Sequence, residues 1–413
     1  MNRKNKKLAA SLCTAAMLLF SLNSCGILEI RDATSELPSE QETSAPVLEQ
    51  AERHNEVEKS ENAESGTGDT ETTEETETEQ NIEEKRIKVS VAGGIAIDNR
   101  INADAAYRAN GEKAYSFLTM FAAVYPRIHN TDIALTTLEA PCADTEAYPV
   151  TDEGVINMPT EALTAVADLG FDVINTAGTN LNTCGDAGIR STVTGVCSTE
   201  VLQIGAYQDN RDASDVRVYE QDGIKIAFLS FMEESPESTM VIPSLTDPEA
   251  VKSSVEYAEM IADIVIASVT WNPADSGKRQ EYAGNLADYG VDIIVGSDGS
   301  SLGKAEWIEN ADGGKSLVVY SLGNLIATGT DAESILSGIL NLEITEAEGS
   351  IVLENVTITP IVTHHTEQNE YQVVELRNYD DAMASLHSVK GLTAEKLKQI
   401  VSSVIPAEFL ANE

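Results

Sequence analysis

The side chains best suited to chemistry fall in six loops that each follow a predicted strand. These loops are residues 93–100, 137–142, 175–186, 269–275, 296–303 and 321–325. Because ligands bind at the carboxyl ends of strands in α/β sheets, we expect the six loops to converge. Their carboxylates include Asp98, Glu139 and Asp298, with Asp144 close by. The other polar side chains are mostly amides and hydroxyls, and no loop contains a histidine.

This inventory suits a pair of metal ions poorly. A two-metal hydrolase holds its ions about 3.5–4 Å apart with several charged or imidazole ligands, and hydroxyls are weak substitutes at neutral pH. The sequence therefore predicts no metal and no cofactor here. A surface rich in Asn, Thr and Ser instead suits a neutral polyhydroxylated ligand such as a glycan. The residues expected to contact it are Thr137, Glu139, Asn180, Thr183, Trp271, Asn272, Ser300 and Asn324.

Four of these side chains keep both a functional and a structural interpretation. Glu139 can bind a ligand or act as a general base, or it can accept backbone N–H groups and hold its loop. Asp298 is either a lone ligand or the Asp of a turn. Asp98 takes part in catalysis or caps the helix that follows it. Trp271 can stack on a sugar or pack in the core.

The histidines and cysteines outside these loops form no motif. His364 and His365 are adjacent in a predicted strand, so their side chains should point to opposite faces and make a poor metal site. Cys142, Cys184 and Cys197 are an odd number, which excludes a complete disulfide framework. Buried thiols are favoured, and a bridge between Cys142 and Cys184 stays open.

Alternating strand and helix patterns between about Lys85 and Glu413 predict one large α/β domain. The predicted strands and hairpins lie at 86–94, 132–141, 170–175, 217–231, 262–269, 290–296, 304–324, 338–345, 351–359 and 370–376. The predicted helices lie at 112–127, 160–169, 186–200, 248–260, 278–289, 380–388 and 393–403. The Asp222-Gly223 pair is a strong signal for a hairpin turn.

The order of these elements and several short stretches resemble the CapA family of poly-gamma-glutamate or capsule synthesis proteins, over about residues 87–376. The matching stretches are "TLEAP" (137–141), "LGFDVINTA" (169–177), "CGDAGI" (184–189), "VTWNP" (269–273), "YGVDIIVG" (289–296) and "VVYSLGN" (318–324). The resemblance implies a metallophosphatase-like α/β/β/α sandwich with mixed sheets. It also implies a role in capsule or cell-envelope polymer synthesis.

The departures from the family pattern fall on its metal-binding positions. In chain order, the family has Gly-Asp, Asn-Leu-Glu, Ala-Asn-Asn-His, His-Trp-Gly and Gly-His-His-Pro-His. At the same five places, in the same order, this chain has Gly93-Gly94, Thr137-Leu138-Glu139, Ala177-Gly178-Thr179-Asn180, Thr270-Trp271-Asn272 and Gly296-Ser297-Asp298-Gly299-Ser300. Thr183 replaces a further Asp. Crowded carboxylates without ions would repel one another, so loss of the ligands together indicates a site that no longer binds metal.

The N-terminal residues predict export and lipidation. A basic start, a short apolar run and Leu22-Asn23-Ser24-Cys25 describe a lipoprotein signal peptide over 1–24, with acylation, for example by palmitate, on Cys25. Residues 25–84 are an acidic, apolar-poor tether, and 85–413 form the CapA-like domain. The net charge of −41 argues against nucleic acid as a partner. We therefore expect an extracytoplasmic protein anchored to the membrane.

The leading hypothesis is a non-catalytic binding or scaffolding component of envelope polymer synthesis, whose protein partners the sequence does not identify. One alternative is an atypical hydrolase that uses Glu139 with Asp98 or Asp298 as acid and base, which requires two carboxylates facing one cavity about 5–9.5 Å apart. Another is a solute-binding lipoprotein, although such proteins usually close two lobes around a hinge.

Overall fold

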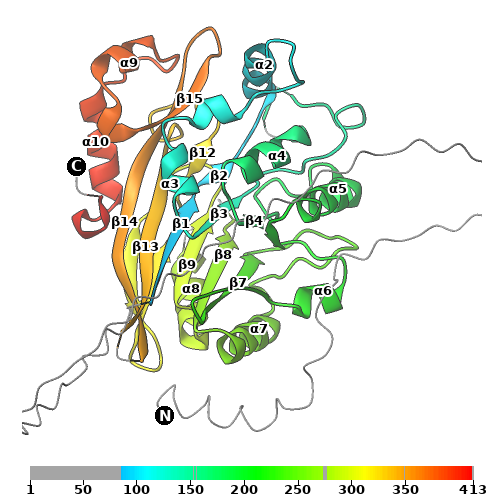
Figure 1. Cartoon of the computed structure of the whole chain (residues 1–413), viewed down its shortest axis with the longest axis vertical. Coiled ribbons are helices and arrows are strands. Elements are labelled where there is room, and N and C mark those ends of the chain that lie inside the picture. Colours follow the sequence, from blue (N-terminus) through cyan, green and yellow to red (C-terminus); the bar gives the residue numbers. More distant parts are fainter. Residues whose placement is uncertain (1–84, 152, 155, 273–276, 348, 412–413) are drawn as a thin grey trace, which may run out of the picture. The chain divides into compact units, whose positions relative to one another are not determined.

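Two mixed β-sheets lie face to face, with helices on their outer sides (Figure 1). The computed structural model describes residues 85–151, 153–154, 156–272, 277–347 and 349–411. This arrangement confirms the predicted α/β/β/α sandwich with mixed sheets. The predicted signal peptide, Cys25 and most of the acidic tether lie outside the described residues. Within the described part, no helix is both long and apolar enough to span a bilayer.

The first sheet has seven strands and joins residues from both ends of the domain. In spatial order they are β15 (Tyr371–Glu375), β14 (Ser350–His365), β13 (Leu336–Ala347), β1 (Lys85–Ala92), β3 (Ile133–Thr137), β4 (Val173–Asn175) and β5 (Leu202–Ile204). Strands β1, β3, β4 and β5 are parallel, whereas β13 pairs antiparallel with β1. The carboxyl ends of the four parallel strands therefore reach the same edge of the sheet.

The second sheet has six strands. In spatial order they are β10 (Ala305–Glu309), β11 (Lys315–Val319), β9 (Ile293–Ser297), β8 (Ile264–Thr270), β7 (Ile224–Met232) and β6 (Arg217–Gln221). The hairpin between β6 and β7 turns at Asp222 and Gly223, whose φ angles of 54° and 79° suit the Asp-Gly pair. A short pair, β2 (Gly94–Ile95) and β12 (Asn324–Ile326), extends from the strand ends.

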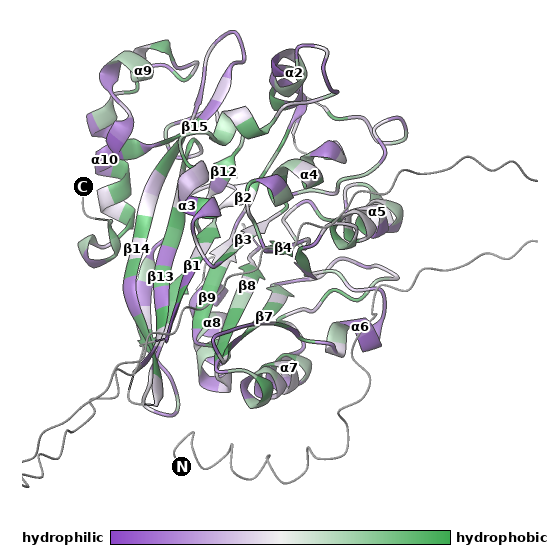
Figure 2. Cartoon of the chain, in the orientation of Figure 1, coloured by the Kyte–Doolittle hydropathy of each residue, from purple (hydrophilic) through white to green (hydrophobic). Residues whose placement is uncertain are grey.

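The two sheets bury their facing sides against each other. Val89 and Leu135 from the first sheet share one apolar cluster with Ile226, Ile266 and Val295 from the second. Figure 2 shows β7, β8 and β9 coloured mostly as hydrophobic, which fits strands covered on both faces. Burial of these branched side chains is the main term that holds the sheets together.

Helices cover the outer face of each sheet. Those on the first sheet are α2 (Asn99–Arg108), α3 (Tyr125–His129) and α4 (Glu161–Asp168), and those on the second are α7 (Pro248–Ile261) and α8 (Gly277–Tyr289). The remaining elements are η2 (Leu118–Phe121), α5 (Gly185–Cys197), α6 (Asn210–Ser214), η3 (Leu376–Asn378), α9 (Asp381–Leu386), α10 (Ala394–Val404) and η4 (Ala407–Phe409). Leu397 and Val401 of α10 join the cluster between the sheets.

Most predicted strands and helices are confirmed, but the predicted helix at 112–127 is wrong. That segment contains only η2 and the start of α3, and Pro126 lies in the first turn of α3, where its missing N–H costs nothing. Ser116 N donates to Ala105 O, so the chain folds back on α2. The helix in this region is α2 itself, for which the sequence carried only the capping residue Asp98.

Candidate functional site

The carboxyl ends of strands from both sheets enclose a cavity of only about 10 Å³. It is lined by Val91, Ala92, Gly93, Gly94, Leu135, Thr137, Ser268, Val295, Gly296, Ser297, Leu322 and Gly323. A void of roughly 10–15 Å³ is needed to hold a single water molecule. This void is therefore too small to hold a sugar.

Glu139, which follows β3, is 1 % exposed beside this cavity. Ser297 Oγ donates to Glu139 Oε1 at 2.7 Å, and Thr179 N donates to Oε2 at 3.2 Å. The backbone oxygen of Glu139 accepts from Asn180 N at 2.8 Å. Burial raises the pKa of Glu139, and the bonds from Ser297 and Thr179 oppose that rise. Glu139 thus joins three loops, as its structural interpretation predicted.

Two glycines allow the loops to approach Glu139 this closely. A Cβ on Gly178 would lie 2.0 Å from the carbonyl oxygen of Leu138 and 2.6 Å from Glu139 Cα. A Cβ on Gly94 would lie 2.4 Å from Glu139 Oε1 and 2.6 Å from Asn324 Oδ1. Because no side chain fits at such distances, this packing requires glycine at both positions.

Asn175, at the end of β4, joins the two sheets through its fully buried side chain. Its Nδ2 donates to Ser268 Oγ of β8 at 2.9 Å, and Ser230 Oγ of β7 donates to its Oδ1 at 3.0 Å. Ala177 N also donates to Oδ1, at 2.9 Å. The amide side chain has its strongest donor and acceptor positions occupied within the protein, which leaves little for a ligand.

Asp298 forms the ion pair of the site. Arg279 Nη1 of α8 lies 3.1 Å from Asp298 Oδ2, and each side chain is 14 % exposed. Asp298 Oδ1 accepts from Ser300 N, Ser301 N and Ser321 Oγ at 3.2–3.3 Å. Asp298 therefore stabilises its own turn while Arg279 neutralises its charge.

Asp98 and Asp144 lie in other hydrogen-bond networks. Asp98 caps α2 by accepting from Arg100 N at 3.0 Å and Ile101 N at 3.1 Å, and it pairs with Arg100 Nη2 at 2.7 Å. This confirms the capping interpretation. Asp144 is exposed and accepts from Glu146 N at 2.9 Å. Neither carboxylate shares a hydrogen-bonding partner with Glu139.

Trp271 packs in the core and has no face available for a sugar. It is 1 % exposed, and its Nε1 donates to Tyr320 O at 2.8 Å. Gly296 makes room for it, since a Cβ there would lie 1.9 Å from Nε1. The stacking role considered for Trp271 is therefore wrong, because the indole is enclosed by β8, β9 and β11.

The other expected ligand contacts range from buried to exposed. Thr137 and Asn324 are each 6 % exposed, and Asn324 Nδ2 donates to Gly299 O at 2.8 Å. Asn180 and Asn272 are half-buried. Thr183 and Ser300 are exposed. These side chains therefore differ widely in how accessible they are to a ligand.

Two charged residues that the sequence interpretation overlooked hold the loop after β8. Glu233 is 2 % exposed and its Oε2 accepts from Asn272 N at 2.9 Å. Arg279 Nη2 donates to Asn272 O at 3.4 Å. Glu233 directly follows β7, so the rule that picked out the six loops would have found it. Arg279 lies in the first turn of a helix, where sequence carries no such signal.

The residues at the strand ends do not fit a pair of metal ions. Of the family's ligand positions only Glu139 and Asp298 carry a carboxylate, and protein groups occupy both. Among the described residues, no group of three or more His, Cys, Asp or Glu is placed to hold a metal ion. No catalytic step through a metal can be derived from this arrangement.

Three histidines cluster at the end of β14, next to β15 in the first sheet. The His387 ring lies 5.2 Å from His364 and 4.5 Å from His365, centroid to centroid. All three are at most 5 % exposed, and burial lowers the pKa of each, that of His387 to about 4. His365 Nε2 lies 3.0 Å from Gly329 O, and His364 Nδ1 lies 3.0 Å from Tyr379 Oη. These contacts support a structural role.

Cys142 and Cys184 are buried and form no disulfide with each other, and Cys197 is half-buried. Burial raises the pKa of the Cys142 and Cys184 thiols. Cys184 precedes α5, and Thr192 of the same helix accepts from Cys142 N at 2.7 Å. Both thiols are therefore held beside one helix as small core side chains.

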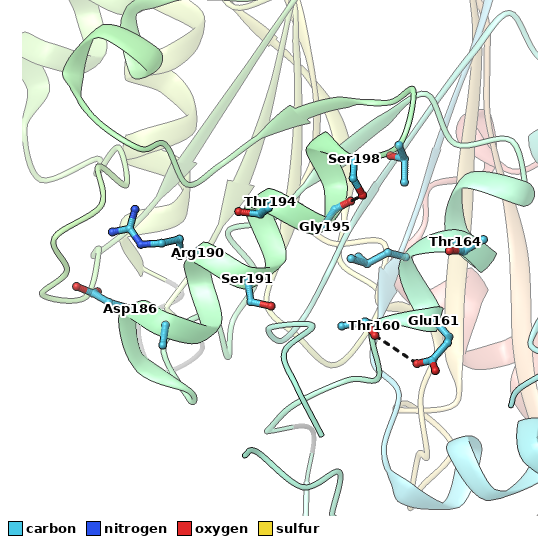
Figure 3. A pocket seen from close by; sticks show the side chains of 12 residues that line it. Thr160, Glu161, Thr164, Asp186, Arg190, Ser191, Thr194, Gly195 and Ser198 are labelled. Atoms are coloured by element: carbon cyan, nitrogen blue, oxygen red, sulfur yellow. Dashed lines mark hydrogen bonds between the residues drawn. The ribbon is translucent and has the colours of Figure 1, made fainter. Parts of the chain in front are cut away.

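A groove of about 950 Å³ runs between α4 and α5 (Figure 3). Its walls carry hydroxyl groups, such as those of Thr164, Ser191 and Thr194, and contain no aromatic ring. Asp186 at one end accepts from Ser238 and Thr239, and these bonds lower the pKa of Asp186 to about 2. Several hydroxyl groups of the groove, those of Ser191, Ser198 and Thr199, donate to backbone oxygens of the protein.

Comparison with known proteins assigns the family. Residues 88–328 match the family model described as bacterial capsule synthesis protein PGA_cap. This chain belongs to that family. Over 224 residues it is 25 % identical to the capsule biosynthesis protein CapA of Bacillus anthracis, which covers 50 % of this chain and 53 % of the relative. The match thus spans about half the length of that curated relative.

Two solved structures share weaker similarity. A phosphatase from Mycoplasma pneumoniae is 11 % identical with a TM-score of 0.42, over 68 % of this chain and 94 % of the other. A calcineurin-like phosphoesterase from Bacillus subtilis is 10 % identical with a TM-score of 0.37, over 78 % of this chain and 96 % of the other.

Proposed function

We propose that this protein is a lipid-anchored, extracytoplasmic member of the capsule synthesis family that acts without catalysis. In this proposal it binds or scaffolds components that assemble a capsule or envelope polymer, poly-gamma-glutamate or a polysaccharide. The observation that carries the proposal is that Glu139 and Asp298, the carboxylates at the family's catalytic position, are already bound by protein groups. A scaffold needs the fold's surface, whereas a hydrolase needs an accessible cavity at the reacting groups.

The arrangement of carboxylates argues against the atypical hydrolase. An acid and base pair must face one substrate across about 5–9.5 Å. Glu139 accepts hydrogen bonds from Ser297 and Thr179. Asp298 forms an ion pair with Arg279, and Asp98 caps the start of α2. Each of these carboxylates is therefore already bound by protein groups, which disfavours its use as an acid or base. The described residues also form one compact unit without a second lobe, which disfavours a solute-binding lipoprotein.

Metal content and phosphoesterase activity of the full-length protein test the non-catalytic half. We expect divalent metal well below one equivalent and no hydrolysis of p-nitrophenyl phosphate above a buffer control. The proposal fails if the protein holds stoichiometric metal, or if hydrolysis occurs and is lost in Glu139→Ala and Asp298→Ala. Asp144→Ala is the matched control, because Asp144 is exposed outside these networks.

Metabolic labelling with a palmitate analogue tests the anchor. Cys25 follows Leu22-Asn23-Ser24, the pattern expected at a lipoprotein cleavage site. Label should enter the wild-type protein and be absent from Cys25→Ala. Cys13→Ala, within the expected signal peptide, should keep the label. Equal labelling of the Cys25→Ala variant would refute lipidation at this residue.

A further inference from the structure

A second cavity, of about 660 Å³, lies at the amino ends of the strands in the six-stranded sheet. It is bounded by the last turns of α7 and α8, the turn between β10 and β11, and the start of β14. Ile264 and Asp292 mark the beginnings of β8 and β9 in its wall. The cavity is thus at the end of the sheet opposite the family's catalytic position. Its volume falls in the range of roughly 300–1,000 Å³ typical of ligand sites.

Four of the polar side chains around this cavity have groups that make no hydrogen bond within the described residues. Asp288, Asp312 and Lys315 are exposed, and within the described residues their side chains make no hydrogen bond or ion pair. Asn310 Oδ1 accepts from Gly314 N at 2.8 Å, and its Nδ2 has no partner in the described part of the chain. The cavity therefore offers both free acceptors and free donors.

Aromatic rings form the apolar part of the wall. Trp307 is half-buried, and its ring lies 6.4 Å from that of Phe409, centroid to centroid, on one side. Trp307 also lines the cavity, and its Nε1 makes no hydrogen bond within the described residues. Tyr289 also lines the cavity, with Lys252 Nζ 5.9 Å from its ring centroid. Neither ring is sealed in the core as Trp271 is.

Unpaired polar side chains next to aromatic rings suit a sugar better than a charged polymer. A sugar presents hydroxyls that both donate and accept and a C–H face that packs on aromatic rings. Carboxylates outnumber ammonium groups around the cavity, which disfavours a polyanion. The groove between α4 and α5 has hydroxyls but no aromatic ring (Figure 3), so it lacks half of this chemistry.

We propose that this cavity binds a neutral oligosaccharide. The sugar packs on the exposed side of Trp307, while Asp288 and Asp312 accept from its hydroxyls and Lys315 donates to them. The proposal is independent of the family's catalytic position and of whether the protein is an enzyme. It places binding at the end of the sheet opposite the six loops.

Titration with chitotetraose, cellotetraose and maltotetraose tests the site, followed by calorimetry and tryptophan fluorescence. The chain has two tryptophans, and Trp271 is 1 % exposed, so a change in emission reports on Trp307. We expect at least one of the three to bind with a Kd of about 0.1–1 mM and to shift the emission. Asp312→Asn and Lys315→Gln should each weaken binding about tenfold, the loss of one good hydrogen bond.

The controls separate a local effect from unfolding. Asp312 and Lys315 are exposed, so their variants should fold normally. Trp307→Ala removes packing on Phe409, so it is compared with Trp307→Phe, which should keep part of the affinity. Thr194→Ala in the α4–α5 groove should bind like the wild type. Absence of binding by all three sugars up to about 10 mM overturns the proposal. So does binding that Asp312→Asn and Lys315→Gln leave unchanged, or binding of spermine or poly-gamma-glutamate in their place.

Discussion

The two ends of the β-sandwich carry similar polar side chains and use them in opposite ways. At the carboxyl ends, Glu139, Asn175 and Asp298 are hydrogen-bonded by neighbouring loops around a void of about 10 Å³. At the amino ends, Asp312 and Lys315 line a cavity of about 660 Å³. Their side chains make no hydrogen bond or ion pair within the described residues. A polar residue is available to a ligand only where the protein has not already satisfied it.

The difference follows from how the loops meet at each end. At the carboxyl ends, loops from both sheets converge, and internal bonds of Glu139, Asn175 and the Arg279–Asp298 pair join them. At the amino ends, the side chains of Asp312 and Lys315 are exposed and make no bond of this kind within the described residues.

The largest expected effect is steric and tests the packing of the carboxyl end. Gly178→Ala places a methyl group 2.0 Å from the Leu138 carbonyl oxygen, so we expect it to lower the free energy of unfolding by about 3 kcal/mol or more. Gly284→Ala, in a helix with open space around it, should raise stability by up to about 1 kcal/mol. Urea unfolding measures both. A Gly178→Ala protein as stable as wild type would mean that the loops can separate.

The next effect concerns the ion pair that neutralises Asp298. Arg279→Met leaves this carboxylate largely buried without its partner and should cost about 3 kcal/mol. Replacing both residues, Arg279→Met with Asp298→Asn, should recover most of that loss. Lys304→Met, which breaks the exposed pair with Glu306, should cost no more than about 1 kcal/mol. No recovery in the double variant would show that Arg279 acts other than through Asp298.

A pH series compares the buried carboxylate with an exposed one. Because the pKa of Glu139 is raised in the folded state, its protonated form favours folding at pH values below 4.5. That contribution is lost as the pH rises through the folded-state pKa, at about 1.4 kcal/mol per pKa unit. The difference in unfolding free energy between wild type and Glu139→Gln should therefore change with pH in this direction. For the exposed Glu367, whose pKa is lowered by the hydrogen bond from Lys390, the same difference between wild type and Glu367→Gln should change with pH in the opposite direction.

The smallest effect is expected at the amino ends. Asp288→Asn and Asp312→Asn remove exposed charges that make no internal bond, so each should change the free energy of unfolding by less than about 0.5 kcal/mol. Thermal and urea unfolding check this. A loss of 2 kcal/mol or so in either variant would show that these groups are structural, and the contrast between the two ends would disappear.

Local patterns predicted most of the elements because the relevant forces are local. The Asp222-Gly223 turn forms where left-handed φ angles are cheap, and the buried runs of β8 and β9 form strands between turn residues. The helix expected at 112–127 failed because Pro126 and the contact of Ser116 with Ala105 favour a folded-back loop. Composition alone does not show which of two adjacent segments makes the helix.

The sequence predicted which residue types lie near the strand ends, but it did not predict which of their side chains are buried in the folded protein. Loss of the metal ligands is visible in Thr137, Thr179 and Ser297, since these positions differ chemically from the family pattern. The burial of Trp271 involves Tyr320, which is 49 positions away in the sequence. The backbone oxygen of Tyr320 accepts a hydrogen bond from the indole N–H of Trp271. Sequence spacing contains no information about that distance.

By itself, the amino-acid sequence determined the family, the alternation of strands and helices, and the absence of a full ligand set at the strand ends. These follow from residue types and periodicity, which are properties of the chain. Only the tertiary structure decided that Glu139 and Asp298 are bound by neighbouring loops and that Asp312, Lys315 and Trp307 line a cavity. Whether a polar group is free depends on which distant atoms satisfy it, and folding alone brings those atoms together.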